Sequence, residues 1–177
     1  MESRDFPKEI IEKAKDSDSK AIAEIFEHYY TKIYRYLYYR TMTTQDAEDL
    51  ASEVFVKVVK SIKRQSGNFE SWLYMIAKNT LTDYYRRNSV RKEYVSDEEV
   101  LENIPDNAKI NSGSLTQEEL KIAINKLTNE QQEVVTLRFI EGYDNRETAQ
   151  IMDKSIGAVK SLKFRALISL KEILKEG

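Results

Sequence analysis

The sequence of 177 residues contains no cysteine, and its one histidine is His28. The absence of cysteine excludes disulfides and thiolate metal sites, and a lone histidine excludes a histidine-cluster metal site and argues against a Ser-His-Asp triad. Glycine and proline are also scarce, with 5 and 2 residues. Because turns draw on these two residue types, their scarcity favours long helices over a strand-rich fold.

Long apolar runs are missing as well. No segment approaches the roughly 20 apolar residues that a membrane span requires, and Met1–Ile10 carries charges of both signs without a signal-peptide core. We therefore expect no membrane insertion and a cytoplasmic location. Charged residues make up 33% of the sequence, yet the formal net charge is -2, so any DNA-binding surface must be a local basic patch.

What the sequence does have is helical periodicity, which predicts three long amphipathic helices in its first half. The first covers residues 20–40, the second begins near the capping residues Thr43–Thr44, and the third runs from Phe69 to about Asn88 with Asn68 as its N-cap. Their expected apolar faces include Ile22, Ile25, Phe26, Tyr29, Ile33 and Leu37; Leu50, Val54, Phe55, Val58, Val59 and Ile62; and Phe69, Trp72, Leu73, Ile76, Ala77 and Tyr84. The many tyrosines of the first helix either pack or stack on bases, and packing is favoured because aromatic rings at helical spacing usually pack.

The periodicity fails over residues 93–113, which are acidic and contain Pro105. This composition predicts a flexible linker. Helical patterns return after it, and two capping-box matches, Ser114 with Gln117 and Thr128 with Gln131, mark expected helix starts. The sequence thus predicts an all-α protein with two small helical domains, residues 1–92 and 114–177, joined by the linker 93–113.

The segment Asp144–Leu167 has the pattern of a helix-turn-helix, with a short helix to Met152, a turn, and a last helix from Ile156 to about Lys175. In the last helix Val159, Leu162, Ala166 and Leu170 form one stripe, while Lys160, Ser161, Phe164 and Arg165 share the opposite face. Basic and hydroxyl side chains can bond base edges, and an aromatic edge can contact a thymine methyl. An ordinary solvated helix is the alternative, but a phenylalanine between charges favours DNA binding.

Three segments carry recognisable motifs: Asp46–Phe55 reads DAEDLASEVF, Asn68–Asn79 reads NFESWLYMIAKN, and Val159–Ala166 reads VKSLKFRA. Together they resemble the extracytoplasmic-function class of the sigma-70 family of RNA polymerase sigma factors. The first segment resembles the signature of sigma region 2.2, and the second resembles that of region 2.3. Thr82–Arg87 continues as region 2.4. Leu127–Gly142 resembles the opening of region 4, and Val159–Ala166, VKSLKFRA, resembles its recognition helix.

The resemblance implies a subunit that binds core RNA polymerase and directs promoter-specific initiation without a cofactor, a metal or catalytic residues of its own. It implies that the last helix reads the −35 element through Lys160, Ser161, Phe164 and Arg165. The −10 element would be read by the loop Gln65–Asn68 and by residues of the third helix. The expected −10 residues are Asn68, Lys78, Asn79, Asp83, Arg86 and Arg87.

Docking on the β′ clamp helices of the polymerase is implied for the second helix. The matching residues are Asp46, Glu48, Asp49, Glu53 and Phe55. The β flap, promoter DNA and an anti-sigma factor are the other partners that the resemblance implies. Trp72 aligns near aromatic residues that stack on flipped bases in larger sigma factors, although a core position is favoured here. The alternative function is a stand-alone helix-turn-helix regulator with an N-terminal dimerisation or sensing domain.

Overall fold

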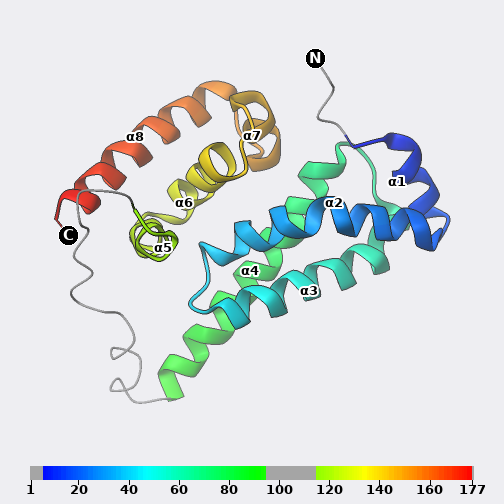
Figure 1. Ribbon diagram of the computed structural model, residues 1–177, viewed down its shortest axis with the longest axis horizontal. Coiled ribbons are helices and arrows are strands. Elements are labelled where there is room, and N and C mark those ends of the chain that lie inside the picture. The colour runs from blue at the N-terminus through cyan, green and yellow to red at the C-terminus, as the bar shows by residue number, and fades with distance from the viewer. Residues whose placement is uncertain (1–5, 95–114, 177) are drawn as a thin grey trace.

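The computed structural model describes residues 6–94 and 115–176, without the side chains of residues 90–94. Within these ranges the regular structure is entirely helical (Figure 1). The N-terminal domain consists of α1 (Lys8–Lys15), α2 (Ser19–Tyr38), α3 (Thr44–Ser61), the 3-10 turn η1 (Ile62–Arg64) and α4 (Phe69–Tyr94). The C-terminal domain consists of α5 (Gln117–Asn125), α6 (Asn129–Val135), the π-helical turn η2 (Thr136–Ile140), α7 (Asn145–Met152) and α8 (Ile156–Lys175).

Side-chain caps fix where the N-terminal helices begin. Asp18 accepts a hydrogen bond from the Ala21 amide at 3.0 Å, and Thr43 accepts one from the Asp46 amide at 3.0 Å. Asn68 accepts one from the Ser71 amide at 2.8 Å. Each cap satisfies an amide that has no partner within its own helix. The predicted starts at Thr43–Thr44 and Asn68 are therefore confirmed.

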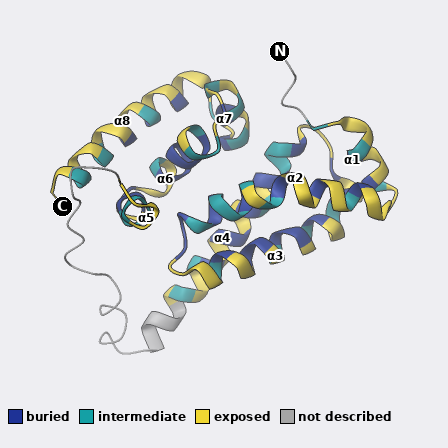
Figure 2. Cartoon of the chain, in the orientation of Figure 1, coloured by how far each residue is buried: buried dark blue, intermediate teal, exposed yellow. Residues whose placement is uncertain are grey.

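The core of the N-terminal domain lies between α2, α3 and α4, where buried faces meet (Figure 2). Its fully buried side chains include Tyr29, Ile33, Tyr36 and Leu37 of α2, Val54 of α3, and Leu73 and Leu81 of α4. The prediction that tyrosines of α2 pack is confirmed for Tyr29 and Tyr36, which have no exposed surface. Burial of large apolar and aromatic side chains supplies the main driving force for this packing.

Two residues that the periodicity placed in the core are exposed. Phe26 is 44% exposed and Val59 is 50% exposed. Both lie at the rim of the α2–α3 contact, where they line a small apolar hollow with Ile22. A helical period finds the apolar face but does not set how much of that face the neighbouring helix covers.

The C-terminal domain contains the predicted helix-turn-helix, formed by α7 and α8. Asp144 and Glu147 form a capping box at the start of α7, and Ser155 caps α8 through the Ala158 amide. The turn between these helices passes through Asp153, whose backbone is left-handed with φ 53°. The predicted bounds of this motif, and the capping box of Thr128 and Gln131 at α6, are confirmed.

Other predicted bounds were wrong. The capping box before α5 is formed by Thr116 and Glu119, two residues after the predicted pair, and Ser114 lies outside the described residues. Helix α4 continues beyond Asn88 to Tyr94, so residues 93 and 94 of the expected linker are helical. The remainder of that linker, residues 95–113, lies outside the described residues. Helix α1, which packs on α2, was not predicted.

The two domains are in contact. Helix α7 lies against α4, and η2 lies against α2. None of the described helices combines the length and apolar character needed to cross a bilayer.

Candidate nucleic-acid and polymerase interfaces

Helix α8 has two chemically distinct faces, as predicted. Val159, Leu162 and Ala166 are at most 5% exposed and fix the helix against the domain. Lys160, Ser161, Phe164 and Arg165 are all exposed, and Phe164 is 65% exposed. The capped N-terminal half of the helix therefore presents two cations, a hydroxyl and an aromatic ring to solvent on one side.

The exposed face of α8 has the chemistry of major-groove readout. Arg and Lys can bond the acceptors of guanine, Ser can donate or accept, and a ring can contact a thymine methyl. Arg165 donates from Nε to the Ser161 carbonyl at the long distance of 3.5 Å. Such a weak local bond leaves the guanidinium available to another acceptor.

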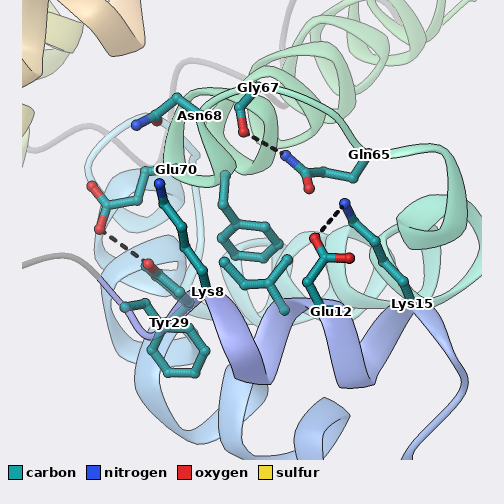
Figure 3. Close-up of a pocket in the computed structure, with 11 residues that line it drawn as sticks. Lys8, Glu12, Lys15, Tyr29, Gln65, Gly67, Asn68 and Glu70 are labelled. Carbon is teal, nitrogen blue, oxygen red and sulfur yellow. Dashed lines mark hydrogen bonds and ion pairs between the residues drawn. The ribbon is translucent and has the colours of Figure 1, made fainter.

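The loop between η1 and α4 lines a pocket of about 490 Å³ (Figure 3). Gln65, Gly67 and Asn68 form one side, and the aromatic rings of Phe6, Tyr29 and Phe69 also contribute to the lining. The Gln65 Nε2 atom donates to the Gly67 carbonyl at 3.0 Å, which closes the turn at Gly67, where φ is +75°. A glycine is favoured there because L side chains strain in this region.

Helix α1 forms the other side of this pocket with Lys8, Ile11, Glu12 and Lys15. The Lys15 ammonium lies 3.0 Å from the Glu12 carboxylate. The Tyr29 and Phe69 rings and the Gln65 amide are almost fully buried. The other polar groups that line the pocket are the Asn68 amide, the ammonium groups of Lys8 and Lys15, and the carboxylates of Glu12 and Glu70. An amide can bond a base edge, and cations can attract the phosphate backbone.

The predicted −10 residues lie in two places. Asn68 lines the pocket, whereas the others occupy α4 beyond its second turn. Asn79 is exposed, and Asp83 pairs with Arg86 at 3.9 Å. The Lys78 ammonium lies 3.4 Å from a carboxylate oxygen of Glu133 in the C-terminal domain. Trp72 is half-buried and lies 5.6 Å from the Phe69 ring, which supports a packing role.

Three of the predicted docking residues line a groove of about 580 Å³ between α3 and the end of α4. Asp46, Asp49 and Glu53 form its acidic wall. Arg86 and Arg87, which were predicted to read DNA, form its basic wall, and Arg87 pairs with Glu53 at 3.6 Å. The groove therefore joins residues that the sequence assigned to two different partners.

Tyr84, which was expected only in the core, also lines this groove. Its hydroxyl donates to Asp46 Oδ2 at 2.7 Å. Burial, followed by the hydrogen bond to Asp46, raises the pKa of Tyr84 to about 12. The hydroxyl therefore stays protonated and holds the Asp46 carboxylate in place.

The other two docking candidates lie differently. Glu48 is exposed on α3. Phe55 is 7% exposed, and its ring lies 5.0 Å from the Phe26 ring and 6.0 Å from the Tyr30 ring. The Phe55 side chain is positioned to support the helix from inside and not to meet a partner directly.

Within residues 6–94 and 115–176, no group of three or more His, Cys, Asp or Glu side chains is arranged to hold a metal ion.

Two family models match the chain. The model of Sigma-70 region 2 matches residues 25–91, and the model of Sigma-70, region 4 matches residues 117–170. Among curated proteins, the ECF RNA polymerase sigma factor BldN of Streptomyces coelicolor is 34% identical over 175 residues. That match covers 95% of this chain and 66% of BldN, so the chain spans just under two thirds of this relative's length.

Two solved structures are similar to the described fold. CnrH, in complex with the cytosolic domain of CnrY, has a TM-score of 0.72 at 19% identity, covering 94% of this chain and 96% of CnrH. The sigma factor RpoE, in complex with the anti-sigma factor NepR from Bartonella quintana, has a TM-score of 0.69 at 25% identity. The match with RpoE covers 88% of this chain and 98% of the RpoE chain.

Proposed function

Since the chain belongs to the sigma-70 family, in its extracytoplasmic-function group, we propose that it binds core RNA polymerase and directs promoter-specific initiation. The observation that carries this proposal is the presence of both a region 2 match and a region 4 match in one chain. The N-terminal domain, residues 1–92, would serve the −10 element and the C-terminal domain, residues 114–177, the −35 element. The polymerase itself would catalyse nucleotide transfer. The chain would work with it in the cytoplasm.

Recognition of the −35 element is assigned to the exposed face of α8. The support is its position as second helix of a helix-turn-helix, which in such motifs enters the major groove with its N-terminal residues. Lys160, Ser161, Phe164 and Arg165 are exposed there together. Arg165 or Lys160 reads a base, and Phe164 supplies apolar contact in the groove.

Recognition of the −10 element is assigned to the pocket beside Asn68 and to the exposed side chains of α4. A base drawn out of the opened duplex would enter the pocket beside the exposed Asn68 amide of the loop Gln65–Asn68, where Lys8 and Lys15 can attract the phosphate backbone. Lys78, Asn79, Asp83, Arg86 and Arg87 continue along α4, where cations can follow the DNA backbone.

Docking on the polymerase is assigned to the groove between α3 and α4. Its acidic wall, Asp46, Asp49 and Glu53, would face the β′ clamp helices, with Glu48 beside it and Phe55 supporting α3 from inside. The C-terminal domain would contact the β flap. An anti-sigma factor is the inferred regulator, because the similar sigma factor RpoE was solved with the anti-sigma factor NepR.

The experiment combines binding with mapping of transcripts. The full chain is mixed with core polymerase and passed over a sizing column, and transcript start sites are sequenced after overexpression. We expect co-elution and a set of new start sites that share two upstream elements. A stand-alone regulator would instead bind duplex DNA by itself and fail to co-elute, which would contradict the proposal.

A further inference from the structure

Glu133 of the C-terminal domain is bound by side chains of the N-terminal domain. It is 2% exposed. The Tyr36 hydroxyl donates to its Oε1 atom at 3.1 Å, and the Lys78 ammonium lies 3.4 Å from its Oε2 atom. A carboxylate so deeply buried needs charged and hydrogen-bonding partners to offset its loss of hydration. Those partners come from α2 and α4 of the other domain.

The carboxylate of Glu141, at the end of η2, is also bound by a side chain of the N-terminal domain. Arg35 donates to Glu141 from Nε at 3.1 Å and from Nη2 at 3.3 Å, a two-point contact that fixes both groups. The Glu141 side chain has no exposed surface in this contact. Two acids that lie on either side of η2 are therefore held by one face of the N-terminal domain.

Further polar contacts align this face. Arg40 donates to the Tyr36 hydroxyl at 2.7 Å, which leaves the phenolic hydrogen free to point at Glu133. The Lys32 ammonium lies 5.3 Å from the centre of the Tyr143 ring. The Tyr74 and Tyr143 rings also pack across the contact, with centroids 5.8 Å apart. Domains of one chain can separate unless their interface is large and mainly apolar.

The contact cannot persist on a promoter that is read at two elements. The −10 and −35 elements lie about 25 base pairs apart, which is about 85 Å of duplex at 3.4 Å per pair. Two domains whose atoms meet at 3.1–3.4 Å cannot reach across that span while they stay in contact. This step rests on the proposed function, which assigns one element to each domain.

Lys78 connects the contact to DNA binding. It is one of the α4 cations assigned to the −10 element, and its ammonium is paired with Glu133. A carboxylate and a phosphate oxygen are both anionic acceptors for an ammonium group. While the domains are together, Glu133 occupies the acceptor position that a phosphate would take.

We propose that Glu133 and Glu141 form an acidic clasp that holds the free chain closed, and that Glu133 competes with −10 DNA for Lys78. The surface formed by Arg35, Tyr36 and Lys78 is thus an anion-binding surface with two occupants. In the closed chain the occupant is the Glu133 carboxylate of its own C-terminal domain, with Glu141 bound beside it. On the promoter the occupant at Lys78 is the DNA backbone.

The test measures domain separation in the full chain without polymerase or DNA. Because the sequence has no cysteine, spin labels can be placed at Glu24→Cys and Lys171→Cys, which are exposed positions in different domains. The chain with an intact clasp should give one narrow distance distribution. The double variant Glu133→Gln with Glu141→Gln should give a broader and shifted distribution. Glu130→Gln is the matched control, since Glu130 pairs with Lys154 of its own domain at 2.8 Å.

The second readout is the affinity of the same full-length variants for a fluorescent single-stranded −10 oligonucleotide. If about nine tenths of the free chain is closed, release of the clasp raises the apparent affinity about tenfold. The double variant should show this gain, and the Glu130 control should not. The reverse pair Arg35→Gln with Tyr36→Phe breaks the clasp from the other domain and covers the case in which the first pair destabilises the C-terminal domain.

The outcomes separate the two proposals. A distance distribution that stays narrow and unshifted in both variant pairs overturns the clasp. A broader and shifted distribution with unchanged oligonucleotide affinity overturns the competition at Lys78. Failure of promoter-directed transcription by every variant would count against the proposed function alone, because the distance measurement requires neither polymerase nor DNA.

Discussion

Alanine substitution on the two faces of α8 should separate DNA reading from folding. Phe164 is 65% exposed, so its removal exposes little buried surface and should change the free energy of unfolding by less than about 0.5 kcal/mol. Leu162 is 5% exposed, and Leu162→Ala should cost about 2–5 kcal/mol through lost burial and the cavity left behind. One helix thus provides both a functional and a structural substitution.

The effect on promoter recognition follows from the contacts that the exposed face can make. Loss of a two-point contact with guanine costs about 1–3 kcal/mol, which is about 5- to 150-fold in binding, and relaxes preference at one base pair. Loss of a phosphate contact weakens all sequences alike and lowers the salt slope by about one. We expect Lys160→Ala or Arg165→Ala to give the first signature. Phe164→Ala should weaken binding without a change in the salt slope.

The assay is transcription by reconstituted holoenzyme on a library of −35 sequences with a fixed −10 element, at two salt concentrations. Lys171→Ala is the control, because Lys171 is exposed on the same helix but lies beyond the recognition face. If Lys160→Ala, Ser161→Ala, Phe164→Ala and Arg165→Ala all keep the original −35 preference and promoter strength, this face of α8 does not read the −35 element.

Three further predictions concern docking, the clasp and a turn. Charge reversal at Asp49 and Glu53 should weaken core binding in a sizing assay at constant helical content, and unchanged affinity would show that the docking groove is misplaced. Burial, opposed by Arg35, raises the pKa of Glu141 to about 7, so folding takes up a proton; the folded state keeps its full stability below the ordinary pKa and loses part of it as the pH rises through 7. The free energy of unfolding, measured with urea from pH 5 to 8, should fall as the pH rises, and Glu141→Gln should abolish this trend. Gly142 has φ +77° with open space around its Cα, so Gly142→Ala should lower the free energy of unfolding by about 1–2 kcal/mol from backbone strain alone, and a thermal melt with no loss would contradict this.

Local signals explain what the sequence predicted well. The caps at Thr43, Asn68, Thr128, Asp144 and Ser155 act over three residues, so a pattern in the sequence can identify such positions. The two faces of α8 follow from the helical period in the same way. The first turn of α5 shows the limit of such signals. Two overlapping capping patterns stand two residues apart, and the structure uses the later one, at Thr116.

The features that the sequence did not predict depend on distant partners. Helix α1 has only eight residues, too few for independent stability, and it forms against α2 and η1. No local pattern identified Glu133, because its partners Tyr36 and Lys78 lie 97 and 55 positions away along the chain. The groove that joins Glu53 to Arg87 is likewise set by the crossing of α3 and α4. Such pairings arise from packing and carry no local pattern.

In the proposed function, this chain gives core polymerase its promoter preference. The most direct measurement is run-off transcription by core polymerase, with and without the chain, on a promoter found by start-site mapping and on versions with the −10 or the −35 element replaced. We expect a transcript only when the chain is present, with a large loss when either element is replaced. A transcript of equal strength from core polymerase alone, or one unaffected by both replacements, would contradict it.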